Sequence, residues 1–399
     1  MEAVKKLTID DIDVKGKCVL VRVDFNVPLD KNGRITDDSR IHAALSTIRK
    51  IIKDGGRAIL MSHLGRPDGQ VVDSMRLTPA ANRLSEILGQ PVIMAPDCIG
   101  PEVEHLINSM KNGECMVLEN LRFHKEETDN DPEFAKKLSA LGDIYVNDAF
   151  GTAHRAHAST EGITRYFDIA ASGYLLQKEI TYLANVMADP ARPFIAVIGG
   201  AKISGKIDVI ANLLKRVDRL LIGGGMMFTF LKAQGFEIGN SLLEEDRIKM
   251  AREILRLSEN KLSLPVDCIV AESFDPGADV RTVAVEEIPI EWYGMDIGPE
   301  TVRKYYKYII EAKTIIWNGP MGVFEMDPFA RGTFEIAQAI SDSTEAGAVS
   351  VIGGGDSASA VKKANLDAKM THISTGGGAS LEMLEGKVLP GLAALTDKK

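Results

Sequence analysis

Residues 349–355, VSVIGGG, lead from a short apolar run directly into three glycines. Residues 220–225 (LLIGGG) and 372–378 (HISTGGG) repeat this arrangement, and residues 194–202 (FIAVIGGAK) lead through two glycines to a lysine. A buried strand that runs into glycines suits a backbone that must approach a ligand closely. Where helices follow, their exposed N–H groups form anion sites. The second half of the chain is therefore predicted to bind phosphates, most simply those of a nucleotide.

The length and composition narrow the class of protein. With 399 residues the chain exceeds one typical hydrophobic core, so we expect two domains. Hydrophobic residues make up 45% and charged residues 26%, as in a globular protein. The formal net charge of −9 disfavours general binding to nucleic acid or to an anionic membrane.

The cysteines and the first residues bear on the expected location. The four cysteines form no CxxC pair, and three of them lie in or beside apolar runs. We therefore expect reduced, mostly buried thiols in a reducing compartment. The opening MEAVKKLTID lacks the apolar core of a signal peptide, and no apolar stretch approaches the length of a membrane span. A cytoplasmic protein is the expectation.

Short apolar runs alternate with longer amphipathic segments along almost the whole chain. Most runs lack polar alternation, as expected for parallel strands covered by helices on both faces. The predicted strands are residues 18–25, 57–62, 91–95, 115–120, 143–148, 194–199, 219–223, 267–272, 314–318, 348–353 and 372–375. Predicted helices include residues 40–53 and 244–257, and residues 279–290 look like an added antiparallel piece. The predicted fold class is α/β, with two Rossmann-like lobes, each a mostly parallel sheet flanked by helices.

One segment is predicted to be a connecting helix with a hinge. Apolar residues recur at helical spacing from Leu176 to Met187, and Pro190 and Pro193 then end the pattern. A helix between a glycine and a proline-rich exit suits a connector between lobes. We therefore expect a first domain at residues 1–172, an interdomain helix at 173–189 and a second domain at 190–387.

Polar clusters follow the predicted strands of the first half, at the ends where open parallel sheets bind ligands. Guanidinium groups suit phosphates and carboxylates, which accept paired hydrogen bonds. The clusters contain Asp24, Phe25 and Asn26, then His63, Leu64, Gly65 and Arg66, then Arg122, then His154, Arg155 and His157, with Arg40 close behind the first. Any one arginine alone would be interpreted as a solvated surface charge. Four at equivalent positions favour an anion site.

The histidines divide into two groups. His42, His105 and His124 stand apart from the clusters and are expected to be ordinary residues. The histidines inside the clusters are better candidates for function. No HExxH motif and no paired Cys/His spacing predicts a zinc site.

The strand ends of the second half supply glycines, two lysines, a carboxylate and a hydroxyl, which are the parts of a nucleotide and magnesium site. One glycine pair alone would be interpreted as a helix-entry turn, but the joint pattern favours a ligand. Mg²⁺ prefers oxygen ligands and usually keeps one or two carboxylates plus substrate phosphates. Asp356, which follows the glycines of residues 353–355, is the predicted magnesium ligand.

Two similar patterns are rejected. Residues 200–206 fit GxxxxGK, but Ile207 stands where a P-loop needs Ser or Thr to hold Mg²⁺. The triple glycines are not followed by the spacing of GxGxxG, so a nicotinamide dinucleotide site is unsupported.

Taken together, several motifs resemble the phosphoglycerate kinase family. They are RVDFNVP, SHLGRP, LENLRFH, VNDAFGTAHRAHAS, GGAK, WNGPMGVFE, IGGGDS and STGGGASLE, in the family's order, from Val21 to Leu384. Two positions depart from the pattern, since the family often has Asp at Gly205 and Thr at Ser357. Neither removes a group that the chemistry needs.

The resemblance implies roles for particular residues. The first lobe is expected to bind 3-phosphoglycerate through Asp24, Phe25, Asn26, Arg40, His63, Leu64, Gly65, Arg66, Arg122 and Arg155. The second lobe is expected to bind ADP or ATP through Lys206, Gly223, Gly224, Gly225, Gly294, Asn318, Glu325, Gly354, Gly355, Asp356 and Ser357, with Mg²⁺ on Asp356. Arg40, Lys202 and the backbone of Gly376, Gly377 and Gly378 are expected to meet the phosphoryl group in transfer. Residues 388–399 are expected to pack back on the first lobe, and the protein is expected to be a monomer.

The implied reaction passes a phosphoryl group between an acyl phosphate and ADP. In the reverse direction the group that accepts the phosphoryl group is a carboxylate with a pKa of about 4. It is already ionised at neutral pH, so no general base is needed. Positioning and charge neutralisation remain, in a site that lobe closure protects from water. A P-loop hydrolase and a non-catalytic anion-binding protein are the alternatives, and ATP consumption that depends on 3-phosphoglycerate separates all three.

Overall fold

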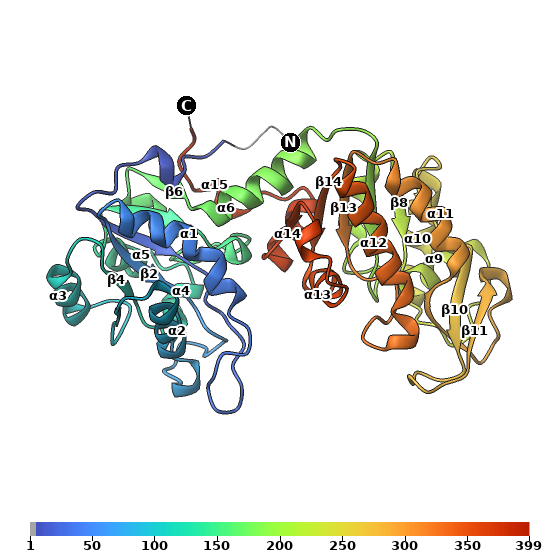
Figure 1. Cartoon of the computed structure of the whole chain (residues 1–399), viewed down its shortest axis with the longest axis horizontal. Helices are drawn as coiled ribbons and strands as arrows, with labels where there is room; N and C mark the ends of the chain where they lie inside the picture. Colours follow the sequence, from blue (N-terminus) through green and yellow to red (C-terminus); the bar gives the residue numbers. More distant parts are fainter. Residues whose placement is uncertain (1–4, 399) are drawn as a thin grey trace. The chain divides into compact units, whose positions relative to one another are not determined.

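The computed structural model describes residues 5–398, apart from the side chain of Asn185. Two compact units divide the chain (Figure 1). The N-terminal unit contains residues 5–181 and 388–398, and the C-terminal unit contains Tyr182–Lys387. The division falls inside the segment expected to be the connecting helix. That segment forms α6 (Tyr174–Glu179), the π-helix η6 (Ile180–Asn185) and α7 (Val186–Ala188).

The N-terminal unit is built on a six-stranded sheet in the order β3-β4-β2-β1-β5-β6, and every pair of neighbours is parallel. Its central strand, CVLVR, is buried along its whole length because helices cover both faces. The strands are β1 (Cys18–Arg22), β2 (Arg57–Met61), β3 (Val92–Met94), β4 (Cys115–Val117), β5 (Ile144–Asn147) and β6 (Ala170–Ser172). The helices besides α6 are α1 (Ser39–Lys53), α2 (Thr78–Leu88), α3 (Pro101–Ser109), α4 (Lys125–Thr128), α5 (Pro132–Ser139) and α15 (Pro390–Ala393).

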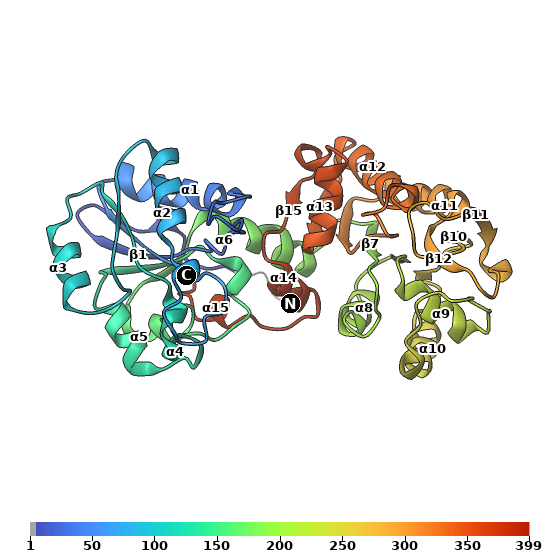
Figure 2. The same ribbon diagram turned by 90° about the horizontal axis from the view of Figure 1, so that it is seen from below.

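The C-terminal unit contains a second six-stranded parallel sheet in the order β15-β14-β13-β7-β8-β9. The strands are β7 (Phe194–Ile198), β8 (Arg219–Ile222), β9 (Leu262–Ser263), β13 (Thr314–Asn318), β14 (Val349–Gly353) and β15 (His372–Ile373). The longer helices are α8 (Ile207–Leu214), α9 (Met226–Gln234), α10 (Ile248–Leu257), α11 (Pro299–Ile310), α12 (Arg331–Glu345), α13 (Gly355–Lys363) and α14 (Gly377–Leu384), which Figure 2 shows from a second side. The prediction of an α/β fold with mostly parallel sheets is confirmed.

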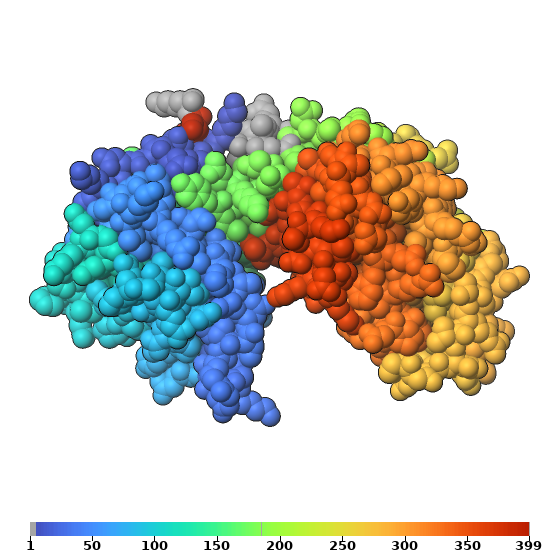
Figure 3. All heavy atoms as spheres, viewed as in Figure 1, coloured from blue at the N-terminus to red at the C-terminus, as the bar shows by residue number. Residues whose placement is uncertain are grey.

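A separate three-stranded antiparallel sheet belongs to the C-terminal unit. It has the order β11-β10-β12, formed by β10 (Asp267–Ala271), β11 (Val280–Ala284) and β12 (Tyr293–Ile297). The expected antiparallel piece is therefore present, although residues 267–272 pair within it and not in the parallel sheet. In the space-filling view of Figure 3 the golden part of the chain, which includes this sheet, reaches the surface. The side of the sheet formed by β11 is exposed, since Val280 is 42% exposed.

The C-terminal segment is attached to the N-terminal unit by backbone pairing. The Leu7 N–H donates to the Thr396 carbonyl at 2.9 Å, and the Thr396 N–H donates to the Ala170 carbonyl at 2.9 Å. Nearby, the Asn147 side chain donates to the Gly391 carbonyl at 3.1 Å. The C-terminal segment therefore pairs with the edge strand β6 on one side and with the N-terminal residues on the other, and it also contacts the end of β5.

Asp148 is a buried acidic residue that follows β5 and contacts the first turn of α6. Its Oδ1 accepts a hydrogen bond from the Leu176 N–H at 3.1 Å, and burial raises its pKa from 3.8 to about 7. Between pH 4 and pH 7 the folded state therefore binds more protons than the unfolded state, so the free energy of unfolding falls as the pH rises through this window.

We predict that Asp148→Asn removes this fall, because the amide keeps an oxygen acceptor but cannot ionise. The expected difference between the two proteins, in the change of unfolding free energy from pH 4.5 to pH 7.5, is roughly 3 kcal/mol. Urea unfolding followed by far-ultraviolet circular dichroism at both pH values measures it. Parallel pH dependence of the two proteins would contradict the assignment.

Candidate active site

The polar clusters of the N-terminal unit lie at one edge of its sheet. The strands that precede them, β4, β2, β1 and β5, are consecutive neighbours and all point the same way. From the first cluster, Asp24 forms an ion pair with Arg40 of α1, whose Nη1 lies 2.5 Å from Asp24 Oδ2. The Arg40 side chain is 37% exposed, so its guanidinium is held in place yet can still reach a ligand.

A second set of contacts fixes the loops after β1 and β2. Asn26 Oδ1 accepts from the Gly65 N–H at 2.9 Å, and Arg122 Nη1 donates to the Gly65 carbonyl at 2.8 Å. Asn120 accepts from the Leu64 N–H at 3.2 Å and donates to the Leu64 carbonyl at 2.8 Å. Phe25 and Leu64 are buried, so their side chains pack in the interior.

Three of the predicted arginines converge on one small pocket. Arg66, Arg122 and Arg155 line a pocket of about 140 Å³ together with Asp68, Gly69, Thr128 and His157. Burial, with Arg22 and Arg155 nearby, lowers the pKa of Arg122 to about 10. Burial and the same arginines lower the pKa of His157 to about 4, so this histidine is neutral at pH 7. Guanidinium groups gathered in this way define an anion site.

A buried network that we did not predict supports this edge. Arg22 is fully buried, and its Nε donates to Ser159 Oγ at 2.8 Å. Ser159 Oγ in turn donates to Glu127 Oε1 at 2.6 Å, and Glu127 is also fully buried. Arg22 Nη2 lies 3.2 Å from His63 Nδ1, so that ring nitrogen accepts. Burial, together with Arg22, Arg122 and Arg40, holds the pKa of His63 well below its usual range.

The C-terminal unit contains a larger pocket of about 530 Å³. Its polar and glycine lining includes five residues that were predicted to bind nucleotide: Gly224, Gly225, Gly294, Glu325 and Asp356. Its apolar lining was not predicted and includes Phe228, Leu242, Phe274, Tyr293 and Val323. In the sequence these residues can be recognised only as members of apolar segments. Residues of the hydrophobic core lie in such segments too, so the sequence does not distinguish pocket residues from core residues.

Other predicted residues lie behind the pocket or beside it. Lys206 Nζ donates to the Asn318 carbonyl at 2.9 Å and also to Asn318 Oδ1. Burial lowers the pKa of Lys206 to about 8. Ser357 Oγ accepts from the Gly319 N–H at 2.6 Å, within the turn after β13. Gly223 is buried, and its N–H donates to the Ile198 carbonyl at 3.0 Å.

The remaining predicted residues follow strands of the C-terminal sheet, and they are exposed except for the buried Gly376 and the partly buried Gly354. Lys202 follows β7 and is exposed, and the turn after it is held by Glu244, whose Oε2 accepts from the Ser204 N–H at 3.1 Å. Gly376 precedes α14, and its carbonyl accepts from the Ser380 N–H at 2.7 Å. Gly377 and Gly378 form the exposed first turn of α14, and Gly354 and Gly355 lead into α13 in the same way. Such turns present backbone N–H groups to an anion.

The comparisons with known proteins identify the class of enzyme as a phosphotransferase, and the chain has two α/β units, one with an arginine-lined pocket and one with a glycine-lined pocket. The family model described as phosphoglycerate kinase matches residues 9–387. The phosphoglycerate kinase of Chloroherpeton thalassium is 58% identical over 396 residues, covering 98% of this chain and 100% of that protein. That of Prosthecochloris aestuarii is also 58% identical with the same coverage.

Solved structures give the same result. Phosphoglycerate kinase from Coxiella burnetii superposes with a TM-score of 0.89 at 41% identity, covering 98% of each chain. The enzyme from Pyrococcus horikoshii OT3 superposes with a TM-score of 0.84 at 36% identity and 98% coverage of each chain. The chain belongs to the phosphoglycerate kinase family. It transfers a phosphoryl group reversibly between 1,3-bisphosphoglycerate and ADP, giving 3-phosphoglycerate and ATP. No helix among residues 5–398 is long and apolar enough to cross a membrane.

We predict that Glu127→Gln destabilises the N-terminal unit by about 3 kcal/mol, because it removes the buried negative charge that Ser159 joins to the buried Arg22. The control is Glu126→Gln, which changes an exposed residue of the same helix and is expected to shift stability by less than about 0.5 kcal/mol. Urea unfolding at pH 7.5 measures both. Equal shifts in the two variants would show that the buried carboxylate is not needed.

Proposed function

We propose that the arginine pocket and the adjoining strand ends bind 3-phosphoglycerate. The observation that carries this proposal is the convergence of Arg66, Arg122 and Arg155, from three separate loops, on one pocket. A phosphate can accept paired hydrogen bonds from such guanidinium groups. Hydrogen bonds hold the loops after β1 and β2 in place next to the pocket. We propose that these loops orient the glycerate through the side chains of Asp24, Asn26 and His63 and the backbone of Phe25, Leu64 and Gly65.

We also propose that the pocket of the C-terminal unit binds ADP or ATP. The adenine base packs against a wall of glycines, which are Gly223, Gly224, Gly225 and Gly294. The carboxylate of Glu325 accepts hydrogen bonds from the ribose hydroxyls. Lys206, Asn318 and the turn at residues 354–357 face the phosphates. The proposal rests on the glycine and apolar lining of the pocket and on the partly buried ammonium group of Lys206, which contacts Asn318.

Magnesium fits this site through Asp356. That carboxylate is exposed, lines the nucleotide pocket and lies in the first turn of α13. One carboxylate together with substrate phosphates is the usual protein environment of Mg²⁺. The ion would offset negative charge on the phosphates.

The chain's own residues account for the transfer step. The carboxylate acceptor is already ionised at neutral pH, so no side chain needs to remove a proton. Arg40 is a partly exposed cation in the first turn of α1, Lys202 is an exposed cation after β7, and the first turn of α14 offers backbone N–H groups. We propose that these groups neutralise charge on the equatorial oxygens. Because the two substrates bind to different units, transfer requires closure that also excludes water.

The proposal also includes the domain boundaries, the cellular location and the oligomeric state of the enzyme. We propose a substrate domain at residues 1–172 with 388–399, an interdomain helix at 173–189 and a nucleotide domain at 190–387. The four cysteines, all within the part of the chain that the structure describes, are buried free thiols, which supports a reducing cytoplasm. We propose that the enzyme is a monomer.

A coupled assay tests the assignment of both sites. ATP consumption is expected to depend on 3-phosphoglycerate. In Arg40→Ala and Lys202→Ala, kcat is expected to fall about a hundredfold, near 3 kcal/mol, with a much smaller change in KM, because the lost contact belongs to the transition state. The exposed residues Arg49 and Lys215 supply matched controls, Arg49→Ala and Lys215→Ala, which should retain kcat. A raised KM with unchanged kcat would reject the catalytic role.

The magnesium assignment has its own test. Asp356→Asn is expected to weaken MgATP binding about tenfold or more, because the amide lacks the charge of the carboxylate ligand. Calorimetric titration with MgATP, and with ATP in the presence of a chelator, separates the metal from the nucleotide. Unchanged affinity for MgATP in the variant would place the metal ligand elsewhere.

A further inference from the structure

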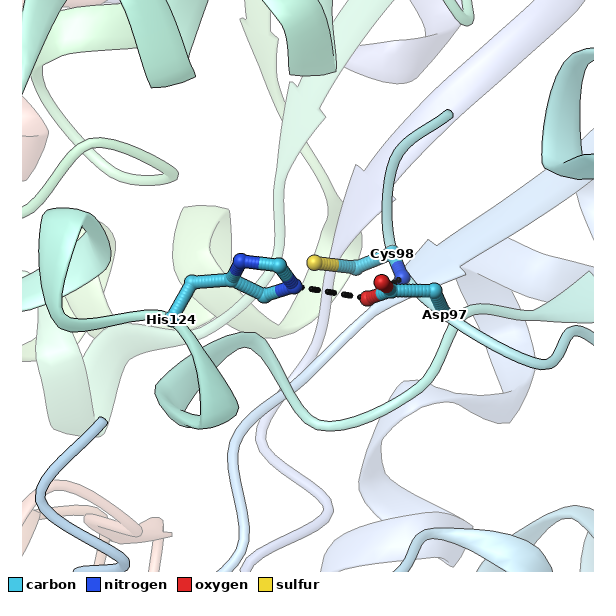
Figure 4. A group of neighbouring side chains, drawn as sticks. All are labelled: Asp97, Cys98 and His124. Atoms are coloured by element: carbon cyan, nitrogen blue, oxygen red, sulfur yellow. Dashed lines mark hydrogen bonds and ion pairs between the residues drawn. The ribbon is translucent and has the colours of Figure 1, made fainter. Parts of the chain in front are cut away.

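Three chemically different donors lie together in the N-terminal unit, in the loops after β3 and β4. Asp97 and Cys98 are adjacent in the loop after β3, and His124 follows the short helix η3 (Leu121–Phe123). A carboxylate oxygen of Asp97, the Cys98 sulfur and a ring nitrogen of His124 all lie within 4.8 Å of one another (Figure 4). Among residues 5–398 no other group of three or more such side chains converges in this way.

The donor set is the one that zinc prefers. Thiolate, imidazole and carboxylate bind Zn²⁺ at about 2.0–2.3 Å in a tetrahedron, which places donors roughly 3.5 Å apart. His124 Nε2 and Asp97 Oδ1 are now joined by a hydrogen bond of 2.7 Å. The Asp97 side chain is 47% exposed, so rotation toward solvent can widen this separation. The His124 side chain is 25% exposed, so an ion can enter from the same side.

Charge favours a divalent ion at this position. A carboxylate and a thiolate carry two negative charges, which one Zn²⁺ balances beside a neutral imidazole. A bound metal displaces the thiol proton of Cys98, since a coordinating thiol is deprotonated outright.

We propose that Asp97, Cys98 and His124 form a Zn²⁺ site, with water as the fourth ligand. Binding replaces the thiol proton and any imidazolium proton, which pass to solvent. The backbone N–H of Cys98 donates to Asp97 Oδ1 at 2.6 Å, so the rotation of the carboxylate that admits the ion exchanges this hydrogen bond for the metal. The ion would tie the loop after β3 to the segment that carries Arg122, and it would stabilise this unit without taking part in phosphoryl transfer.

Calorimetric titration with ZnCl₂ tests the site in the full chain, after treatment with a chelator and without nucleotide. One equivalent is expected to bind, with affinity that falls at least about tenfold for each pH unit by which the pH is lowered, because the thiol proton and any imidazolium proton are displaced. With Co²⁺ as the probe, a thiolate-to-metal charge-transfer band in the near ultraviolet is expected. The melting temperature of the protein should rise with added Zn²⁺.

Variants locate the bound ion. Cys98→Ser should remove the charge-transfer band, and His124→Gln, a change at a partly exposed residue, should weaken Zn²⁺ binding at least tenfold. Cys268→Ser and His105→Gln change the same residue types elsewhere and should leave both signals intact. Circular dichroism establishes that each variant is folded.

Two results would overturn the proposal. One is the absence of saturable Zn²⁺ binding at a tenfold excess of metal. The other is binding that persists in both Cys98→Ser and His124→Gln, which would place the ion at other donors such as the histidines of the substrate clusters. In either case the three residues would be a hydrogen-bonded clamp between two loops.

Discussion

Parallel pairing of strands buried on both faces determines where most of the candidate residues lie. In the six-stranded sheet of each unit the strands point the same way, so the residues that follow them gather at one edge of that sheet. The N-terminal edge receives long cationic side chains, and the C-terminal edge receives glycines. The same architecture therefore gives one unit a charged surface and the other a backbone-lined pocket.

Gathering cations at one edge has an energetic cost that the structure offsets locally. Arg22, Arg122 and Arg155 repel one another, which contributes to the lowered pKa of Arg122. Two devices reduce the repulsion. Glu127 is buried and joined to Arg22 through Ser159, and the nearby histidines are held neutral. A bound anion would complete this balance, so the electrostatics of the arginine pocket favour a negatively charged ligand.

The sequence predicts the parallel sheets and the strand-end clusters because apolar runs and the polar residues after them are local signals. It does not predict Arg22, since nothing local distinguishes a buried arginine at the end of an apolar run. The strand β12 is missed because Gly294 and Asp296 interrupt its apolar pattern. Cys98 and His124 are far apart in the sequence, so no spacing motif could indicate that they meet.

The glycines of the C-terminal pocket show why side chains are excluded from parts of its wall. A Cβ on Gly294 would collide with the ring of Phe228, and one on Gly224 would collide with the backbone of Gly200 and Pro320. These segments are already bonded to each other, since the Gly200 N–H donates to the Pro320 carbonyl at 2.8 Å and the Gly224 N–H to the Met321 carbonyl at 2.8 Å. Backbone hydrogen bonds between neighbouring loops therefore hold this part of the pocket wall in place. Walls held in this way lose little conformational entropy when a ligand binds, which would suit the proposed nucleotide site.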